Sequence, residues 1–321
     1  MISTCLSLLE ENALEHLLDG CSLLAPIYRL ISHPFSKHLI SLPSQPTFCR
    51  QFRYEMEPEE LRGIFVLKCV LSRSPWNSET HQYDPDCIIM AIYGEISTLA
   101  FTRPGYKAWI DIESPTRCYD DIAFYKGIFY AVDVHGEVFA CCSDELFACR
   151  IDDNQKVVAK AVAPRPEGTQ DFIKKYIVES SGGLLLVSRM RGGHLYSYYE
   201  DEDEDQEEVI NDDPYVTIGF TILKLKRSTQ ARSKYKYKYV KVHSLGDRAL
   251  FVGDNSSVSL SASSFNGCKA NCIYFTDDNF EFYGANGGGY DMGVFSMEDR
   301  DTSKPYPVES LSYFSTPLWY I

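Results

Sequence analysis

The sequence predicts an all-β fold of the sandwich, barrel or propeller class. More than a dozen short runs of apolar, aromatic and β-branched residues are separated by turn-forming residues, and almost no helical periodicity follows residue 20. The 321 residues are 45% hydrophobic and 13% aromatic, which is enough for a large core. Closed β architectures of this length commonly form one domain, so we expect one β domain over residues 21–321 after a short segment over 1–20.

The N-terminal segment predicts one short helix followed by β structure. Within residues 3–19 the leucines and Ala13 recur at helical spacing, and Gly20 is a suitable helix stop. The apolar runs 23–31 and 38–42, separated by the turn-like 33–37, then predict a hairpin.

A second hairpin is expected within residues 118–142. Residues 127–132 form an apolar strand pattern, Asp133 to Gly136 supply turn chemistry, and a second apolar run covers 138–142. Because both faces of the first strand are apolar, we expect this hairpin between packed sheets. The other strands are predicted over 63–71, 87–93, 97–101, 107–112, 146–151, 156–162, 172–179, 184–190, 215–225, 237–243, 249–252, 257–262, 272–275, 293–296 and 318–321.

Weak internal repetition favours a propeller. The segment 129–133 resembles 273–277, and 250–254 is a looser match to both; each is an apolar strand that ends in Asp. The 144 residues between Asp133 and Asp277 correspond to about three blades of roughly 40–50 residues. Such strands also recur by chance in all-β proteins, so the repetition alone leaves both interpretations open.

The formal net charge of −14 is concentrated in one segment. Residues 200–213 hold ten acids and no base; without them 35 acids face 31 bases, a difference of −4. We expect a flexible acidic loop at about 199–214. The near-neutral remainder predicts no general nucleic-acid binding.

Lysine and tyrosine alternate over residues 234–239. Period two places the lysines on one face and the tyrosines on the other, which predicts an outer strand with its tyrosines towards the core. A single-strand nucleic-acid site is the alternative interpretation of this pattern.

The N-terminus has no basic region before its apolar stretch, and no apolar run approaches the roughly 20 residues that cross a bilayer. We therefore expect a soluble protein of the cytoplasm or nucleus, without membrane contact, whose eleven cysteines are reduced and buried.

No catalytic, cofactor-binding or metal-binding residue is predicted. Cys268 and Cys272 lack a second ligand pair for zinc, as do the cysteines at 141, 142 and 149. His135 and His194 stand beside glycines in turns without a triad partner, and the glycine-rich 284–289 lacks the phosphate-loop pattern. Asn255 begins a glycosylation sequon, which means little in a protein that is not secreted.

Several stretches resemble the KIB-type β-propeller family of plants, a group of F-box-associated proteins. These are His33-Pro34-Phe35 with 40–43, YDDIAFYKGIFYAVDVHGEVF at 119–139, YIVESSGGLLLVSR at 176–189, the specific 240–279, DMGVFSMEDRD at 291–301, and 317–321. Together they cover nearly the whole chain in order. The resemblance implies a single propeller of about six or seven blades, with the last strand completing a blade begun by the N-terminal hairpin.

The resemblance also implies a function. Family members commonly carry an F-box and are thought to be substrate receptors of Skp-cullin-F-box ubiquitin ligases; a few resemble kinase-binding regulators. Only one short helix is expected before the first hairpin, so no F-box is recognisable and direct docking to a Skp adaptor is not expected. We expect a non-enzymatic protein-interaction propeller whose partner is a ubiquitylation substrate or a kinase. The alternative of another class is an enzyme, which three or more convergent ionisable side chains in the propeller channel would favour.

Overall fold

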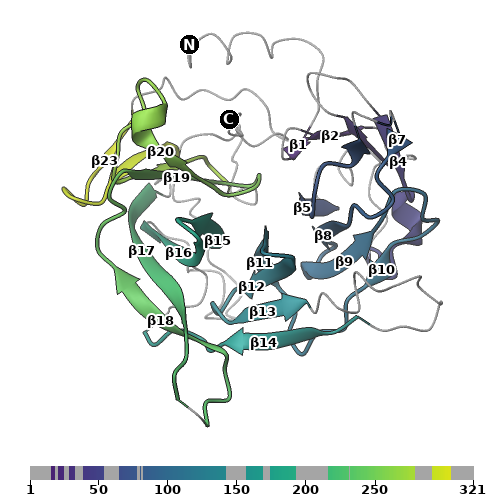
Figure 1. Cartoon of the computed structure of the whole chain (residues 1–321), viewed down its shortest axis with the longest axis horizontal. Helices are drawn as coiled ribbons and strands as arrows, with labels where there is room; N and C mark the ends of the chain where they lie inside the picture. The colour runs from purple at the N-terminus through teal and green to yellow at the C-terminus, as the bar shows by residue number, and fades with distance from the viewer. Residues whose placement is uncertain are drawn as a thin grey trace, which may run out of the picture.

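A computed structural model describes residues 16–18, 21–24, 29–32, 39–53, 65–77, 80, 82–141, 157–168, 174–192, 216–230, 232–278 and 291–304. These residues form an all-β propeller (Figure 1). The described part contains two 3-10 turns, η2 (Gln45–Thr47) and η3 (Ala262–Ser264), and no α-helix. No helix in this part is both long and apolar enough to cross a lipid bilayer.

Four sheets have four strands each, and a fifth has five strands. The first sheet contains β1 (His16–Leu18), β2 (Cys21–Leu24), β3 (Arg29–Ser32) and β4 (Leu39–Leu42). The second contains β5 (Val66–Leu71), β8 (Ile89–Tyr93), β9 (Thr98–Thr102) and β10 (Ile110–Asp111). The third contains β11 (Tyr119–Tyr125), β12 (Ile128–Asp133), β13 (Val138–Cys141) and β14 (Ala159–Ala163).

The fourth sheet contains β15 (Lys174–Ser180), β16 (Gly183–Gly192), β17 (Val216–Arg227) and β18 (Tyr237–Val242). The fifth runs in the order β20 (Val258–Ser261), β19 (Arg248–Val252), β21 (Cys272–Phe275), β22 (Gly293–Ser296) and β23 (Thr302–Ser303). A separate two-stranded hairpin, β6 (Trp76–Asn77) with β7 (Gln82–Tyr83), lies on the connection from β5 to β8.

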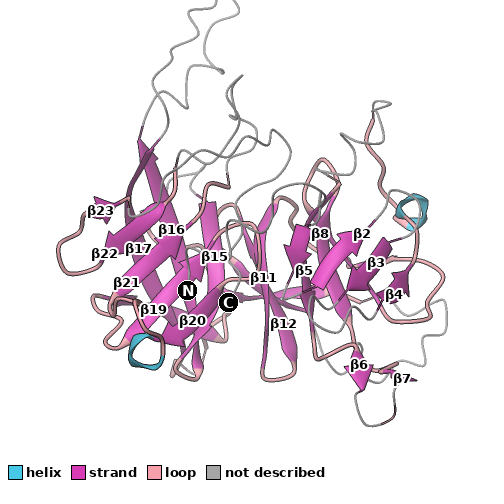
Figure 2. Cartoon of the chain, turned by 90° about the horizontal axis from the view of Figure 1, so that it is seen from above, coloured by secondary structure: helices cyan, strands magenta, loops and turns pink. Residues whose placement is uncertain are grey.

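The sheets stand around a common centre, each with its first-named strand innermost (Figure 1). The innermost strands contact one another in succession, β1 with β5, β5 with β11, β11 with β15 and β15 with β20. The hairpin β6–β7 and the turn η3 lie on the same side of the ring (Figure 2). The other side, where β11 begins at Tyr119 and β15 begins at Lys174, is called the Asp120 face below, after the second residue of β11.

The core consists of apolar layers between adjacent sheets. One layer joins the second and third sheets around Met90, Phe101 and Phe129, and another joins the fourth and fifth around Phe220 and Phe275. Nearly every residue of β8 and β9 is buried, as expected for a strand covered on both faces. Burial of this apolar surface is the main stabilising contribution to the ring.

Most predicted strands are confirmed within a few residues at their ends, including the hairpin β12–β13. The predicted strand 23–31 is divided into β2 and β3. The predicted strands 146–151 and 318–321, the acidic loop 199–214 and the glycine-rich 284–289 lie outside the described residues.

The predicted N-terminal helix is not confirmed. His16–Leu18 form β1, and residues 1–15 lie outside the described part. The register places Leu18 opposite Cys21, and the two residues between them are Asp19 and Gly20, a pair that favours two-residue hairpin connections. The same glycine was expected to end a helix.

The expected six or seven blades are not confirmed either, because the described residues form five sheets of four or five strands. The interpretation of 250–254 and 273–277 as repeats from different blades was wrong. The segments around Leu250 and Ile273 are adjacent parallel strands of the same sheet, with these two residues directly paired, and not equivalent strands of different blades. Asp133 and Asp277 follow strands that lie two sheets apart, from the third sheet to the fifth.

The strand β11 was missed, although it is the innermost strand of the third sheet. Its sequence contains Asp120 and Asp121, which usually favour turns. Both side chains are largely buried here and have charged partners. By contrast, the orientation predicted for the outer strand β18 is confirmed, since Tyr237 and Tyr239 are half-buried and Lys238 is exposed.

Candidate functional site

The innermost strands carry a charged cluster centred on Asp121. Its side chain is fully buried and forms an ion pair with Lys68 of β5, with Nζ and Oδ1 2.5 Å apart. Asp121 Oδ2 accepts hydrogen bonds from the backbone N–H of Ile177 at 2.9 Å and from Ser257 Oγ at 3.2 Å. One carboxylate therefore connects the second, third, fourth and fifth sheets.

Asp120 and Lys174 lie beside this centre, at the Asp120 face. The Nζ of Lys174 is 3.9 Å from Asp120 Oδ1, and the backbone N–H of Lys175 donates to Asp120 Oδ2 at 3.0 Å. Burial raises the pKa of Asp120, although Lys174 and Lys175 oppose it. Burial lowers the pKa of Lys174, but Asp120, Asp278 and Asp254 outweigh it, so the net pKa is raised. Lys174 is thus a partly accessible cation among several carboxylates.

A second charged cluster surrounds Arg189, near the end of β16. The guanidinium donates to Asp278 Oδ1 and to Asp291 Oδ2, each at 2.9 Å, and its side chain is fully buried. Its Nε donates to Thr217 Oγ1 at 2.7 Å, and backbone carbonyls of residues 276 and 291 accept further bonds at 2.7 Å. The guanidinium carbon also lies 4.6 Å from the centre of the Phe275 ring. The five N–H donors of Arg189 therefore have partners on both the fourth and the fifth sheets.

The charges around Arg189 set the protonation of its neighbours. Burial alone would raise the pKa of Asp278, but Arg189, Arg191 and Lys174 outweigh it and lower the pKa to about 2. Burial raises the pKa of Tyr176 far above its ordinary value, assisted by the charge of Asp278, to which the Tyr176 hydroxyl donates. Asp278 is thus a carboxylate and Tyr176 a neutral phenol over the ordinary pH range.

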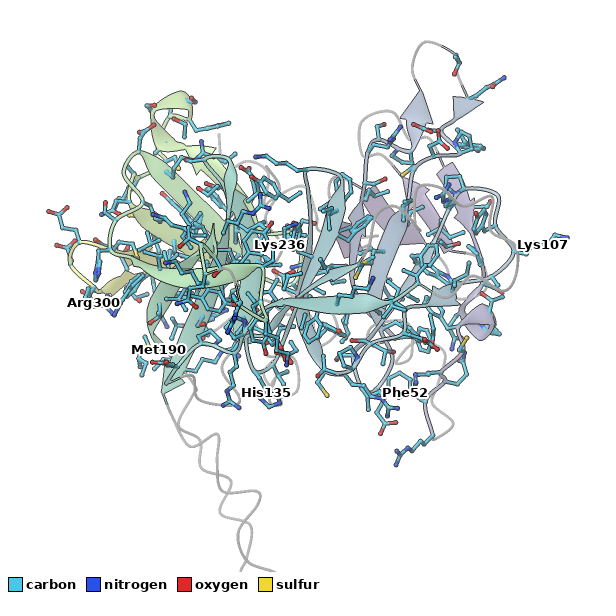
Figure 3. The ribbon with its side chains drawn as sticks, turned by 60° about the horizontal axis from the view of Figure 1, so that its bottom comes forward. Phe52, Lys107, His135, Met190, Lys236 and Arg300 are labelled. Carbon is cyan, nitrogen blue, oxygen red and sulfur yellow. The ribbon has the colours of Figure 1, made fainter. Side chains whose placement is uncertain are left out.

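These two clusters meet at the Asp120 face. Arg191 pairs with Asp278 and lies 3.6 Å from Asp291, and about a tenth of its side chain is exposed, against 27% for Lys174. Phe52, His135 and Met190 lie along the same rim of the ring (Figure 3). The accessible part of the charged cluster is therefore small and is surrounded by loops and strand ends.

The described carboxylates and cations of the cluster form ion pairs and hydrogen bonds mainly within the protein. Each of Lys68, Asp120, Asp121 and Arg189 has a charged or backbone partner in the protein. Ionisable side chains do converge between the innermost strands, but Lys68, Asp121 and Arg189 are buried and paired, which is what a structural connection between sheets needs. Across the residues that the structure covers, no group of three or more His, Cys, Asp or Glu side chains could hold a metal ion.

The described histidine, cysteines and Asn255 that were weighed as candidate site residues from the sequence do not belong to this charged cluster. His135 lies in the β12–β13 turn, where its backbone N–H donates to Asp133 Oδ1 at 3.0 Å. Cys141, Cys268 and Cys272 are not in disulfides, and burial raises the pKa of the last two. Asn255 is only 7% exposed, which makes its sequon unsuitable for glycosylation. Cys142, Cys149 and His194 lie outside the described residues.

The cluster was not predicted from the sequence, because charged residues ordinarily favour turn and surface positions. A usable pattern was present, since Lys68, Asp121 and Arg189 each lie in a strand in which most residues are apolar. A charged residue in a buried strand needs a partner of opposite charge, so such positions predict one another. The cluster also explains three of the resembling stretches, because Asp121, Arg189 and Asp291 belong to 119–139, 176–189 and 291–301.

Comparison with known proteins gives F-box proteins of Arabidopsis thaliana. "Putative F-box protein At5g55150" is 28% identical over 282 residues, which cover 88% of this chain and 69% of that protein. "F-box protein At2g26160" is 24% identical over 261 residues, covering 80% of this chain and 69% of that protein. "F-box protein SKIP23" is 26% identical over 211 residues, which cover 63% of this chain and 43% of that protein. The family profile described as "KIB1-4 beta-propeller" matches residues 20–296, and the chain therefore belongs to the KIB1-4 β-propeller family.

Proposed function

We propose that this chain is a non-enzymatic protein-interaction propeller that recognises its partner as the substrate-recognition domains of F-box ubiquitin-ligase receptors do. The observation that carries the proposal is the family match over residues 20–296, together with relatives that are named F-box proteins. Propeller loops on a rigid ring are a common place for partner contacts. The proposed partner is a protein of the cytoplasm or nucleus, either a ubiquitylation substrate or a kinase.

The Asp120 face is the proposed contact surface. It combines partly exposed charges, Lys174 and Arg191, with loops and strand ends from at least three sheets. The buried pairs beneath it, Lys68 with Asp121 and Arg189 with Asp278, fix the strands that present these groups. A rigid support of this kind reduces the entropy that is lost when a partner binds.

Proximity labelling in plant cells tests the proposal. The chain is fused to a labelling enzyme and compared with Lys174→Glu, which reverses a charge on the Asp120 face, and with Lys107→Glu, an exposed control in the β9–β10 connection. We expect a set of proteins labelled by the wild type and by Lys107→Glu but not by Lys174→Glu. Identical sets for all three would contradict the choice of surface, and no set above background would contradict the interaction function.

The identity of the labelled proteins separates the two kinds of partner. A ubiquitylation substrate should accumulate when the proteasome is inhibited. Co-purification of a Skp adaptor with the chain would identify a ligase subunit, and its absence would favour an independent regulator. A kinase that is labelled but keeps its abundance, and whose activity changes when the chain is added, would favour the kinase-binding regulator.

The enzyme alternative rests on the convergence of ionisable side chains between the innermost strands. It predicts that a pocket at Asp120 and Lys174 binds a small molecule. Screening wild type and Asp120→Asn for metabolites that raise the melting temperature tests it: a compound that stabilises only the wild type would favour an enzyme, and a set of labelled protein partners without such a compound would favour the binding function.

A further inference from the structure

A strongly basic surface lies on the outer rim of the fourth sheet, away from the Asp120 face. The hairpin of β17 and β18, called the basic hairpin below, has eight Lys or Arg and no acid between residues 224 and 241. Seven of these cations are exposed, namely Lys226, Arg227, Arg232, Lys234, Lys236, Lys238 and Lys241. The turn between the two strands projects beyond the ring (Figure 1). In a chain with a net charge of −14, this is a local concentration of the opposite sign.

The cations of the basic hairpin face one another instead of facing acids. Lys226 lies directly opposite Lys238 in the antiparallel register, and Lys224 lies opposite the exposed Val240. Like charges directly opposite one another destabilise a strand pair. Among the salt bridges of the described residues, none involves a cation of this hairpin. A bound anionic group would remove this repulsion.

The backbone of β18 offers a second means of binding. The N–H of Ser228 donates to the carbonyl of Lys236 at 2.9 Å, so hydrogen-bonded pairs continue at Lys226 with Lys238 and at Lys224 with Val240. The intervening residues of β18, Tyr237, Tyr239 and Lys241, then direct their backbone N–H and carbonyl groups away from β17. Within the part of the chain that the structure describes, β18 is the last strand of its sheet. This edge can accept an additional strand.

The tyrosines indicate which kind of anion fits. Tyr237 packs against Tyr130 with ring centres 6.4 Å apart, and the Tyr239 hydroxyl donates to the carbonyl of Gly136 at 2.8 Å. Both rings therefore contact the third sheet, and Lys236 Nζ lies 5.4 Å from the centre of the Tyr237 ring, so neither ring is open for the base stacking that single-stranded nucleic-acid sites generally use. A long polyanion would also be repelled by the acidic remainder of the protein. A short acidic peptide would contact only the basic hairpin.

We propose that the basic hairpin binds an extended acidic segment of a partner protein as an added strand along β18. Alternate side chains of such a segment project to the same face, at a spacing of about 7 Å that matches Lys236, Lys238 and Val240. Carboxylates at these positions pair with the two lysines, and the backbone supplies the remaining hydrogen bonds. This surface is separate from the Asp120 face. The proposal therefore does not depend on whether the Asp120 face binds a partner.

Fluorescence anisotropy with a labelled decapeptide of alternating Glu and Thr tests the proposal. The protein variants are the triple Lys226→Gln, Lys236→Gln, Lys238→Gln and a matched triple elsewhere on the surface, Lys107→Gln, Lys269→Gln, Arg300→Gln, which removes the same charge from other exposed positions. We expect the hairpin triple to weaken binding about tenfold, because it removes the two exposed ion pairs and the neighbouring charge of Lys226, and the matched triple to weaken it less than about twofold. Equal effects of both triples would overturn the proposal.

Further probes distinguish the mode of binding and the occupant. A peptide of the same charge with proline at alternate Thr positions should bind more weakly, because proline cannot donate to the strand edge. Equal binding of the proline peptide, or tighter binding of a single-stranded DNA of equal charge, would overturn strand addition by an acidic peptide. Absence of peptide binding would overturn the proposal and would mean that the lysines only keep the outer edge of β18 solvated. If binding appears only after the acids at 201–208 are replaced by Gln and Ser, the occupant is the chain's own acidic segment and not a partner.

Discussion

Lys68 and Asp121 form an ion pair between the innermost strands of two adjacent sheets, with both side chains at most 4% exposed. Because Asp121 also accepts hydrogen bonds from the fourth sheet and from Ser257, the pair is the point at which four sheets are connected. Removing one partner leaves an uncompensated buried charge, which is far more costly than the loss of an exposed pair.

We therefore expect Lys68→Met to lower the free energy of unfolding by about 3–5 kcal/mol. The double variant Lys68→Met, Asp121→Asn should lose less than Lys68→Met alone, since the uncompensated carboxylate is then absent. Urea unfolding followed by circular dichroism measures both, with Lys107→Met as the exposed control. A loss below about 1 kcal/mol for Lys68→Met would show that the pair contributes no more than a surface salt bridge.

The strands and their general order could be predicted from the sequence, because apolar runs bounded by turn residues reflect burial directly. β18 is an example: the alternation of Lys and Tyr predicted which side chains face the core, and the structure agrees. The second hairpin was predicted for the same reason, and Asp133 caps its turn by accepting from the N–H groups of residues 135 and 137.

The charged cluster could not be predicted in the same way, because it depends on contacts between residues far apart in the sequence. Asp121 meets Lys68 and Ser257 only when three sheets are in place, and Arg189 meets Asp291 across 102 positions. Local pattern assigns an acid to a turn, whereas the ring supplies a partner that allows it to be buried. The parallel pairing of β19 with β21 was missed for a related reason, since sequence similarity of two strands does not say whether they belong to one sheet or two.

Asp278 should make the free energy of unfolding depend on pH in the acidic range. Its pKa is lowered from an ordinary value of 3.8 to about 2, because Arg189, Arg191 and Lys174 outweigh the effect of burial. The folded state therefore gains stability above pH 4, and this contribution is lost as the pH falls from about 4 towards 2. The difference in unfolding free energy between wild type and Asp278→Asn should narrow by about 1 kcal/mol between pH 6 and pH 3.

Urea unfolding at several pH values measures this difference. The exposed Asp86→Asn serves as the control, and its difference from wild type should change little over the same range. A wild-type to Asp278→Asn difference that stays constant down to pH 3 would mean that Asp278 keeps an ordinary pKa.

Gly253 is required by its close approach to Thr276. A Cβ at position 253 would lie 2.1 Å from Thr276 Oγ1, and a β-branched side chain has little freedom to move away. We expect Gly253→Ala to destabilise the protein by about 1–3 kcal/mol through overpacking. Thr276→Ala removes the obstructing atom, so a double-mutant cycle should show that the second substitution restores part of the loss. Additive losses in the cycle would place the cause of the Gly253→Ala effect elsewhere.

The described cysteines should divide into two groups by their reactivity. None of the seven is in a disulfide. Cys69, Cys87, Cys141 and Cys272 are buried, whereas Cys49 and Cys118 are exposed, which contradicts the expectation that all cysteines are buried. A brief treatment of the folded protein with N-ethylmaleimide should modify Cys49 and Cys118 and spare Cys69, Cys87 and Cys272 until urea is added.

Peptide-level mass spectrometry with light reagent before unfolding and heavy reagent after it measures the two groups. Cys49 should react more slowly than a cysteine in a short peptide, because partial burial and the neighbouring Asp111 raise its pKa and reduce the thiolate fraction. Since Cys69 is in β5 and Cys272 in β21, light labelling of either would indicate that the corresponding sheet opens in the native state. Equal light labelling of Cys49 and Cys69 would contradict the packing of the second sheet.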